Sequence, residues 1–344
     1  MASGAWKLIL CADAMPELLI LKPSSLGDIV HGLQVATSIK AQWPSDRPQL
    51  RIGWVVRDMF APLVRSCEAV DHIYLFRRFG GVLDFLRLMR EVRETHYDYL
   101  FDFQGLLRTG LMAWRTPGAK KYGRSDAREG ASLFYDEKVP LPVGGRNSHA
   151  LDILLQFCPV LGLRPELQGA LRFREPSNLN LAFADGKGGT PPIVMFPDSR
   201  RAEKRWPGFP QLTELILRED RTRRVVWAGN SYLPYKGARF PSDRFLNLTG
   251  NTSLLSLPAL IRRAGWVISN DSGPMHLAAA LGTRTLGIFG PTDPRLFGPY
   301  PFTSPTNHVV QAPVGDLRML PAKEVFARFQ RIDALALRSD FRMR

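Results

Sequence analysis

A repeated alternation of short apolar runs with helix-like stretches is the feature that most constrains the fold of this chain. In the first half, apolar runs at 18–21 and 50–56 flank a helix-like stretch at 28–41. The alternation continues with a helix-like stretch near 81–95, a strand-like run at 97–103 and a helix from about Leu106. Strands and helices in this order build a parallel sheet covered by helices. The first half therefore predicts a doubly wound α/β domain.

The alternation weakens between about 165 and 192 and then begins again. This connection is rich in proline and glycine, which favour turns. Beyond it, strand-like runs at 193–196, 224–229, 265–269 and 285–289 alternate with helix-like segments around 209–218, 253–264 and 275–281. The sequence therefore predicts two α/β domains, residues 1–170 and 171–320, and 344 residues are enough for two cores.

Residues 321–344 are expected to form a terminal helix that packs on the body of the protein. Apolar side chains recur on one face at helical spacing: Val325, Phe326, Phe329, Ile332 and Leu335. The arginines of this segment, Arg328, Arg331 and Arg338, would also suit a helix that lies on a membrane surface. Packing against protein is the favoured interpretation, because an apolar stripe on a terminal helix most often docks.

Composition restricts the compartment and the class of partner. A hydrophobic content of 45% excludes a disordered chain, and three separated cysteines do not indicate a disulfide framework. No apolar run approaches the roughly 20 residues of a membrane span and no signal-peptide core is evident, so a cytoplasmic protein is expected. The net charge of +14 lies mostly in residues 171–344, where 25 Lys and Arg face 14 acidic residues. Such an excess attracts phosphates, nucleic acid or an anionic membrane, or it only solubilises the surface.

The first polar loop, residues 22–31, leads from a strand into a helix. Open α/β sheets bind ligands at this edge, where Gly27 permits close approach and the helix N-terminus offers amide donors. Asp28 is expected to stay ionised and to face the crevice. A simpler interpretation, in which Asp28 and the preceding serines only cap the helix, also fits these residue types.

The second polar loop, residues 197–207, carries a hydroxyl, Ser199, and four cations, Arg200, Arg201, Lys204 and Arg205. Guanidinium forks and a mobile ammonium recognise phosphate oxygens. The loop is therefore a candidate phosphate site, although a solvated basic turn has the same composition.

The third polar loop, within residues 269–282, again joins a strand to a helix. Asp271 or Ser272 can cap this helix, and the amides of Ser272 and Gly273 can hold a pyrophosphate. His276 lies one turn into the helix, where a histidine is more often structural than catalytic. A further polar turn, 290–294, is expected to face the same ligand.

Together these motifs resemble the heptosyltransferases of glycosyltransferase family 9, over about residues 18–295. The loop 22–31 looks like the family's N-terminal loop, and 102–108 resembles the segment after its next strand. Residues 122–135 are similar to the acceptor side of the branch that adds the first heptose to Kdo-lipid A, lipopolysaccharide heptosyltransferase I, and His149 fits the same pattern.

The donor motifs of the family resemble Lys204–Pro207 and the turn 271–276, with Ser272 where the family usually has threonine. The resemblance implies a GT-B fold, two Rossmann-like domains around a central cleft, with acceptor in the first and donor in the second. It also implies an inverting transfer from ADP-heptose to Kdo-lipid A, without metal, cofactor or nucleic acid, in the cytoplasm and in peripheral contact with the inner membrane. Asp28 is then the general base and Lys204 neutralises the departing ADP.

The resemblance assigns the remaining contacts as well. Donor contacts are expected from Ser199, Arg200, Lys204, Asp271, Ser272, Gly273 and His276. Acceptor contacts are expected from Ser25, Gly27, Gln104, Arg108, Arg124 and Arg128. Arginines suit the carboxylates and phosphates of such an acceptor, and each could equally belong to a surface ion pair.

Two other functions are compatible with the residues. The same fold could use a UDP- or GDP-hexose, because fold and phosphate chemistry do not determine the sugar. The chain could instead be a non-catalytic basic module that binds nucleic acid or lipid head groups, although no zinc-finger, RNA-recognition or helix-turn-helix pattern stands out.

Overall fold

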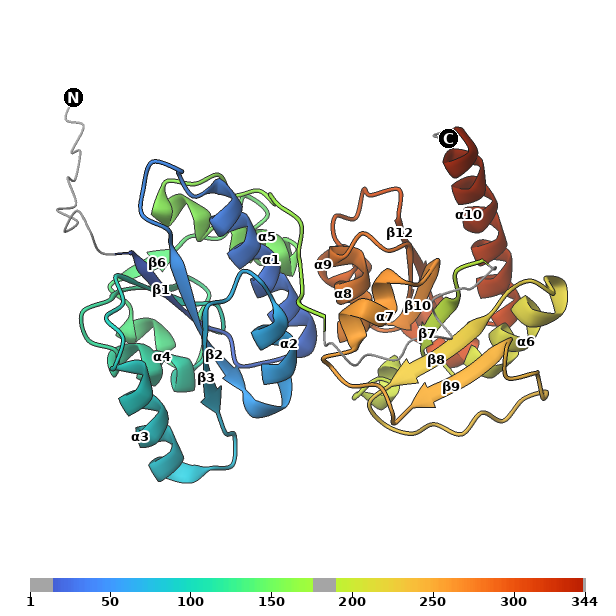
Figure 1. Cartoon of the computed structure of the whole chain (residues 1–344), viewed down its shortest axis with the longest axis horizontal. Coiled ribbons are helices and arrows are strands. Elements are labelled where there is room, and N and C mark those ends of the chain that lie inside the picture. Colours follow the sequence, from blue (N-terminus) through green and yellow to red (C-terminus); the bar gives the residue numbers. More distant parts are fainter. Residues whose placement is uncertain (1–14, 176–189, 343–344) are drawn as a thin grey trace.

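The computed structural model describes residues 15–175 and 190–342, which form two α/β domains side by side (Figure 1). In the first domain the strands are β1 (Glu17–Leu21), β2 (Arg51–Arg57), β3 (His72–Phe76), β4 (Tyr99–Asp102), β5 (Lys120–Arg124) and β6 (Glu137–Val139). Its helices are α1 (Leu26–Gln42), α2 (Ala61–Ser66), α3 (Gly81–Val92), α4 (Leu107–Trp114) and α5 (Ala150–Leu155).

The second domain repeats this alternation. Its strands are β7 (Ile193–Phe196), β8 (Val225–Gly229), β9 (Phe245–Thr249), β10 (Trp266–Asn270), β11 (Thr285–Phe289) and β12 (Asn307–Gln311). Its helices are α6 (Phe209–Glu219), α7 (Leu257–Arg262), α8 (Gly273–Ala280), α9 (Pro294–Phe297) and α10 (Ala322–Arg342).

Both sheets are six-stranded and parallel, with the orders β3-β2-β1-β4-β5-β6 and β12-β11-β10-β7-β8-β9. Counted from the first strand of each domain, the two orders are the same. The predicted GT-B architecture of two doubly wound domains is confirmed. Half of the expected connection at 165–192, residues 176–189, lies outside the described residues, as does Cys11, whereas Cys67 and Cys158 are buried free thiols.

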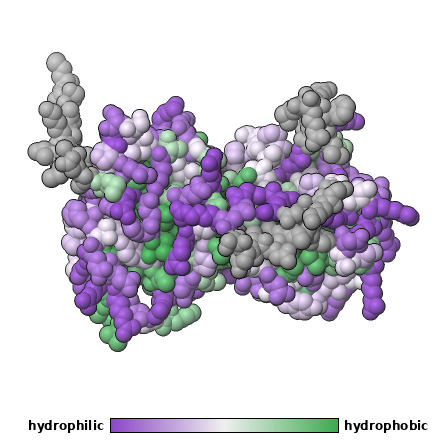
Figure 2. Space-filling model, in the orientation of Figure 1, coloured by the Kyte–Doolittle hydropathy of each residue, from purple (hydrophilic) through white to green (hydrophobic). Residues whose placement is uncertain are grey.

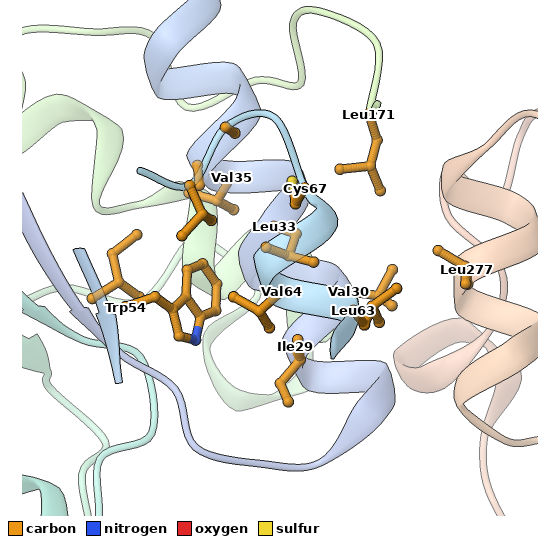
Figure 3. Close-up of a cluster of buried hydrophobic side chains, with 14 of the residues drawn as sticks. Ile29, Val30, Leu33, Val35, Trp54, Leu63, Val64, Cys67, Leu171 and Leu277 are labelled. Carbon is orange, nitrogen blue, oxygen red and sulfur yellow. The ribbon is translucent and has the colours of Figure 1, made fainter. Parts of the chain in front are cut away.

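The central strands are apolar along their whole length because helices cover both faces of each sheet. All four residues from Leu18 to Leu21 are fully buried, as is typical of a parallel strand between two layers of helices. One apolar cluster crosses from the first domain to the second, and Figure 3 shows Leu277 of α8 across from Val30 and Leu63. The two domains therefore share a packed interface, in which α1 meets α8.

The structure departs from the sequence expectations mainly at the sheet edges. The predicted runs correspond to β1, β2, β4, β7, β8, β10 and β11, but β3, β5, β6, β9 and β12 were not predicted. The terminal helix α10 packs through Val325, Phe329 and Ile332. Leu335 was predicted on the same face but is 59% exposed, because the last turns of α10 project beyond the domain (Figure 1).

None of the helices within the described ranges combines the length and the apolar content that crossing a bilayer requires.

Candidate active site

A cavity of about 730 Å³ opens between the two domains. It lies at the carboxyl ends of β1, β7 and β10, beside the points where the strand order of each sheet reverses. Ligands of open α/β sheets bind at such switch points. Of the predicted site residues, the cavity is lined by Ser25, Gly27, Asp28, Ser199, Arg200, Lys204, Asp271, Ser272, Gly273 and His276.

Asp28 both caps α1 and faces the cavity, so the two interpretations of this residue hold together. Its Oδ2 accepts hydrogen bonds from the amide of Ser25 at 3.0 Å and from the hydroxyl of Ser25 at 2.6 Å. Its side chain is 44% exposed. Burial alone would raise the pKa of Asp28, but the Lys22 ammonium and the Ser25 donors outweigh burial and hold the pKa well below its usual range. Asp28 is therefore ionised at neutral pH.

Lys22 supports this carboxylate from inside the domain. The side chain of Lys22 is 4% exposed, and its Nζ lies 3.7 Å from Asp28 Oδ1 and donates to the carbonyl oxygen of Phe103 at 3.3 Å. Burial lowers the pKa of Lys22, and the attraction of Asp28 opposes this only in part. A buried ammonium needs such a partner, so Lys22 and Asp28 fix one another at the end of β1.

Asn270 joins two of the loops that face the cavity. Its fully buried side chain donates to the carbonyl oxygen of Pro197 at 2.9 Å and accepts from the amide of Trp206 at 3.0 Å. The indole of Trp206 is buried and donates to the carbonyl oxygen of Leu320 at 2.9 Å. The basic loop is thus anchored at both ends, unlike a loosely solvated turn.

Asp271 positions the lysine of that loop. Its Oδ2 accepts from Lys204 Nζ and from the Thr292 hydroxyl, both at 2.5 Å. The side chain of Asp271 is 5% exposed and that of Lys204 is 16% exposed. The ion pair holds the ammonium at the cavity wall, and Arg200 lines the same cavity with an exposed side chain.

The helix N-termini of the two domains differ at the cavity. Ser272 precedes α8, and within the described chain its side chain makes no hydrogen bond to the helix amides; its hydroxyl lies 3.2 Å from that of Ser269. The first amides of α8 can therefore bind an anion, which the helix dipole favours. At α1 the carboxylate of Asp28 in the first turn accepts from the amide of the preceding Ser25.

Two glycines allow the domains to approach one another. A Cβ atom on Gly27 would lie 2.6 Å from His276 Cδ2, and one on Gly273 would lie 2.5 Å from Leu26 Cγ. Real Cβ atoms do not come so close to a neighbour. Each glycine therefore leaves room for a side chain of the other domain.

Three histidines meet beside this contact. His276 Nδ1 lies 3.1 Å from His31 Nε2, and the ring centroids of His31 and His149 are 5.4 Å apart. Burial lowers the pKa of His276 to about 4, more than nearby Asp271 raises it, so the ring is neutral at pH 7. His276 thus contacts His31 of the first domain and also lines the cavity.

Comparison with known proteins identifies the family. The sequence profile of glycosyltransferase family 9 (heptosyltransferase) matches residues 85–313, about two thirds of the chain. The chain belongs to glycosyltransferase family 9. It is therefore an enzyme, a glycosyltransferase, and not the non-catalytic basic module considered above.

Similar enzymes cover nearly the whole of this glycosyltransferase. Lipopolysaccharide heptosyltransferase 1 of Salmonella typhimurium is 27% identical over 332 residues, which cover 91% of this chain and 99% of the relative. The enzyme of the same name from Pseudomonas aeruginosa is 28% identical over 301 residues, covering 83% and 81%. The solved structure of E. coli heptosyltransferase WaaC with ADP shares the fold, with a TM-score of 0.72 at 23% identity and coverage of 92% and 99%.

Four residues predicted to bind the acceptor do not line the cavity: Gln104, Arg108, Arg124 and Arg128. Arg124 pairs with both carboxylate oxygens of Asp126 at 2.8 Å, and Arg108 lies over the ring of Phe76 at 5.2 Å. The amide of Arg128 donates to the carbonyl oxygen of Gly105 at 2.9 Å. The side-chain oxygen of Gln104 is buried and has no hydrogen-bond partner within the described chain.

Sequence reasoning gave no site role to Lys22, His31 or Asn270. Lys22 and Asn270 occur directly at the ends of buried strands, which is a usable signal for positioning residues. His31 gives no such signal, because its partner His276 is 245 positions away. Within residues 15–175 and 190–342, no group of three or more histidine, cysteine or carboxylate side chains could hold a metal ion.

Proposed function

We propose that this family 9 enzyme transfers heptose from ADP-heptose to a Kdo-lipid A acceptor with inversion and without a metal. One observation carries the proposal: an ionised carboxylate, Asp28, faces an anchored lysine and a helix N-terminus across a single cavity. The relatives support it, since they are lipopolysaccharide heptosyltransferases. A second E. coli WaaC structure is described with ADP-2-deoxy-2-fluoro heptose.

The second domain holds the donor. The amides at the start of α8 and the Lys204 ammonium face the pyrophosphate, and Ser199 and Arg200 add a hydroxyl and a guanidinium. These donors stabilise the negative charge that develops on ADP as the glycosidic bond breaks. No further cation is needed in this scheme, because Lys204 supplies the charge that a metal would otherwise provide.

Asp28 accepts the proton of the attacking hydroxyl. The low pKa of Asp28 makes it a weak base toward a free alcohol. The hydroxyl becomes strongly acidic as its oxygen bonds to the anomeric carbon, so the proton moves late, when even a weak base can accept it. Attack from the Asp28 side, opposite the departing ADP, inverts the anomeric configuration.

The acceptor lies against the first domain. Ser25 and Gly27 line the cavity beside Asp28, and Lys22 connects that carboxylate to the segment after β4. Gln104 offers a buried oxygen to a sugar hydroxyl, whereas Arg108, Arg124 and Arg128 present cations to the Kdo carboxylates and the phosphates. An enzyme with this donor and this acceptor works in the cytoplasm at the surface of the inner membrane.

Thermal unfolding and transfer, measured in EDTA, test this function. ADP-heptose is expected to raise the melting temperature, because a ligand bound only by the folded state stabilises it. Transfer to Kdo-lipid A is expected in the same buffer. A UDP- or GDP-hexose that stabilises the enzyme where ADP-heptose does not would assign a different donor, and activity that requires an added divalent ion would contradict the metal-independent mechanism.

A further inference from the structure

Helix α3 and the turn before it carry apolar side chains that nothing in the described chain covers. Phe79 is 90% exposed, Val82 is 73%, Leu83 is 69% and Leu86 is 44% exposed. Val82, Leu83 and Leu86 lie near the start of α3, and Phe79 lies in the turn directly before the helix. We call these four residues the α3 face.

The helix does not need the α3 face for its own packing. Leu88, Met89 and Val92, farther along the helix, are at most 3% exposed and belong to the core of the first domain. Four large apolar side chains gathered on one exposed face, rather than scattered singly, indicate a binding surface.

Arginines surround the α3 face. Residues 77–93 contain five arginines, Arg77, Arg78, Arg87, Arg90 and Arg93, against the two acidic residues Asp84 and Glu91. Asp84 is neutralised by Arg77 at 3.7 Å and by Arg87 at 3.2 Å. Figure 2 shows this combination, with hydrophobic surface beside hydrophilic surface at the lower end of the first domain, where Figure 1 places α3.

We propose that the α3 face docks on an anionic lipid bilayer. Apolar side chains with an arginine border match such a surface, because the side chains enter the region between head groups and acyl chains while guanidiniums bind anionic phosphates. A second copy of the chain is a poorer match, since two copies joined face to face would bring the arginines together. The lipid acceptor of the proposed function gives the docking a purpose, and to that extent this inference depends on the proposed function.

The position of α3 brings the site toward the same membrane. The α3 face begins three residues after Phe76, the carboxyl end of β3. All strands of this parallel sheet end on the same side, so β3 ends on the side where the Asp28 loop leaves β1. Docking through α3 therefore turns the acceptor-binding edge of the first domain toward the lipid.

Helix α10, whose arginines had suggested a membrane role, is a weaker candidate. Val325, Phe329 and Ile332 of its apolar stripe are buried against the second domain, and Leu335 is 59% exposed. Leu335 therefore provides a matched control for Leu83, because the two leucines have similar exposure on helices of different domains.

Vesicle co-sedimentation of the full-length protein tests the proposal. The vesicles contain phosphatidylethanolamine with or without phosphatidylglycerol and hold neither donor nor acceptor, so binding is measured independently of any transfer. The wild type is expected to sediment only with phosphatidylglycerol vesicles, less as salt is added. Leu83→Asp is expected to reduce the bound fraction about tenfold or more, because it places a charge in the interface. Leu335→Asp is expected to stay within about twofold of the wild type, since that side chain stays in water.

Arg78→Gln combined with Arg90→Gln tests the charged border separately from the apolar side chains. This variant is expected to weaken binding severalfold and to flatten its salt dependence. Unchanged melting temperatures would show that all the variants are folded. The proposal is overturned if the wild type does not sediment, if Leu335→Asp loses as much binding as Leu83→Asp, or if ultracentrifugation shows a dimer that Leu83→Asp dissociates. A failure of heptosyl transfer would leave all of these results unaffected.

Discussion

The two domains share one strand order but place groups of opposite charge on their sides of the cavity. In the first domain the first turn of the helix after β1 carries a carboxylate, Asp28, which accepts hydrogen bonds from Ser25 and is paired with the buried Lys22. In the second, the helix after β10 begins with uncapped amides beside the anchored Lys204. The start of α1 therefore offers a carboxylate that can accept a proton. The start of α8 instead offers amides that can bind an anion. The same topology serves two chemical tasks because a few residues at the strand ends differ.

Replacement of Asp28 is expected to have the largest effect. Asp28→Asn keeps an oxygen for the cap but removes the base, so kcat for heptosyl transfer should fall by about 10² to 10⁴. The melting temperature should also fall, because the buried Lys22 ammonium loses its partner carboxylate, although the asparagine oxygen still accepts from the Ser25 amide. If kcat fell only in proportion to a lowered melting temperature, Asp28 would be a capping residue alone.

Replacement of Lys204 should act in the other domain and weaken the binding of ADP. Lys204→Met removes a charged hydrogen-bond donor worth about 1.5–3 kcal/mol, so the Kd for ADP should rise about 10- to 100-fold. Calorimetric titration with ADP measures this effect. Lys204→Arg keeps the charge and should recover part of the affinity, and a Kd that is the same in all three proteins would remove Lys204 from the donor site.

Gly27→Ala should separate the domains while leaving each of them folded. The new methyl group would collide with His276 of the second domain, at a cost of about 1–3 kcal/mol. We expect a larger radius of gyration in small-angle scattering and a severalfold loss of kcat. Gly32→Ala is the control, because its methyl group would collide with Trp54 inside the first domain. Equal scattering changes in the two variants would argue against a specific contact between the domains.

Acidification by a single pH unit should weaken the same interface, with the smallest of these effects. The pKa of His276 is lowered to about 4 in the folded protein, so below its usual value of 6.5 the unfolded chain binds the proton first. Stability is therefore complete above pH 6.5 and falls between pH 6.5 and 4, by at most about 1.4 kcal/mol per pH unit for one histidine. The melting temperature should depend less steeply on pH across this range in His276→Gln, but not in the control His96→Gln, whose side chain is exposed. A weaker pH dependence in both variants would show that the net charge of the protein, and not His276, causes the loss of stability in acid.

The sequence was sufficient for the centre of each sheet and insufficient for its edges. Runs such as Ile193–Phe196 and Thr285–Phe289 are buried on both faces and therefore apolar throughout. The edge strands β6 and β12, with the sequences EKV and NHVVQ, are only partly covered and carry polar residues that hide them from a search for apolar runs. The neighbouring β5, KKYGR, was missed for the same reason.

The site shows a similar division between local and long-range information. The cavity loops were predicted because each follows an apolar run and carries its polar residues together, as at 22–31 and 197–207. The hydrogen bonds of Asn270 to both ends of the loop 197–207 join residues that only the fold brings together, and so does the contact of His31 with His276. The acceptor contacts of Arg108, Arg124 and Arg128 stay predictions, since these side chains lie outside the cavity between the domains.

The division of work between the domains is tested most directly by the affinity of the Asp28→Asn variant for ADP, measured by calorimetric titration. If the first domain supplies the base and the second binds the donor, the Kd should stay within about twofold of the wild-type value or become slightly tighter, since a negative charge is removed from the cavity that receives the anionic donor. A Kd weakened tenfold or more would contradict this division, because it would place Asp28 in the donor site.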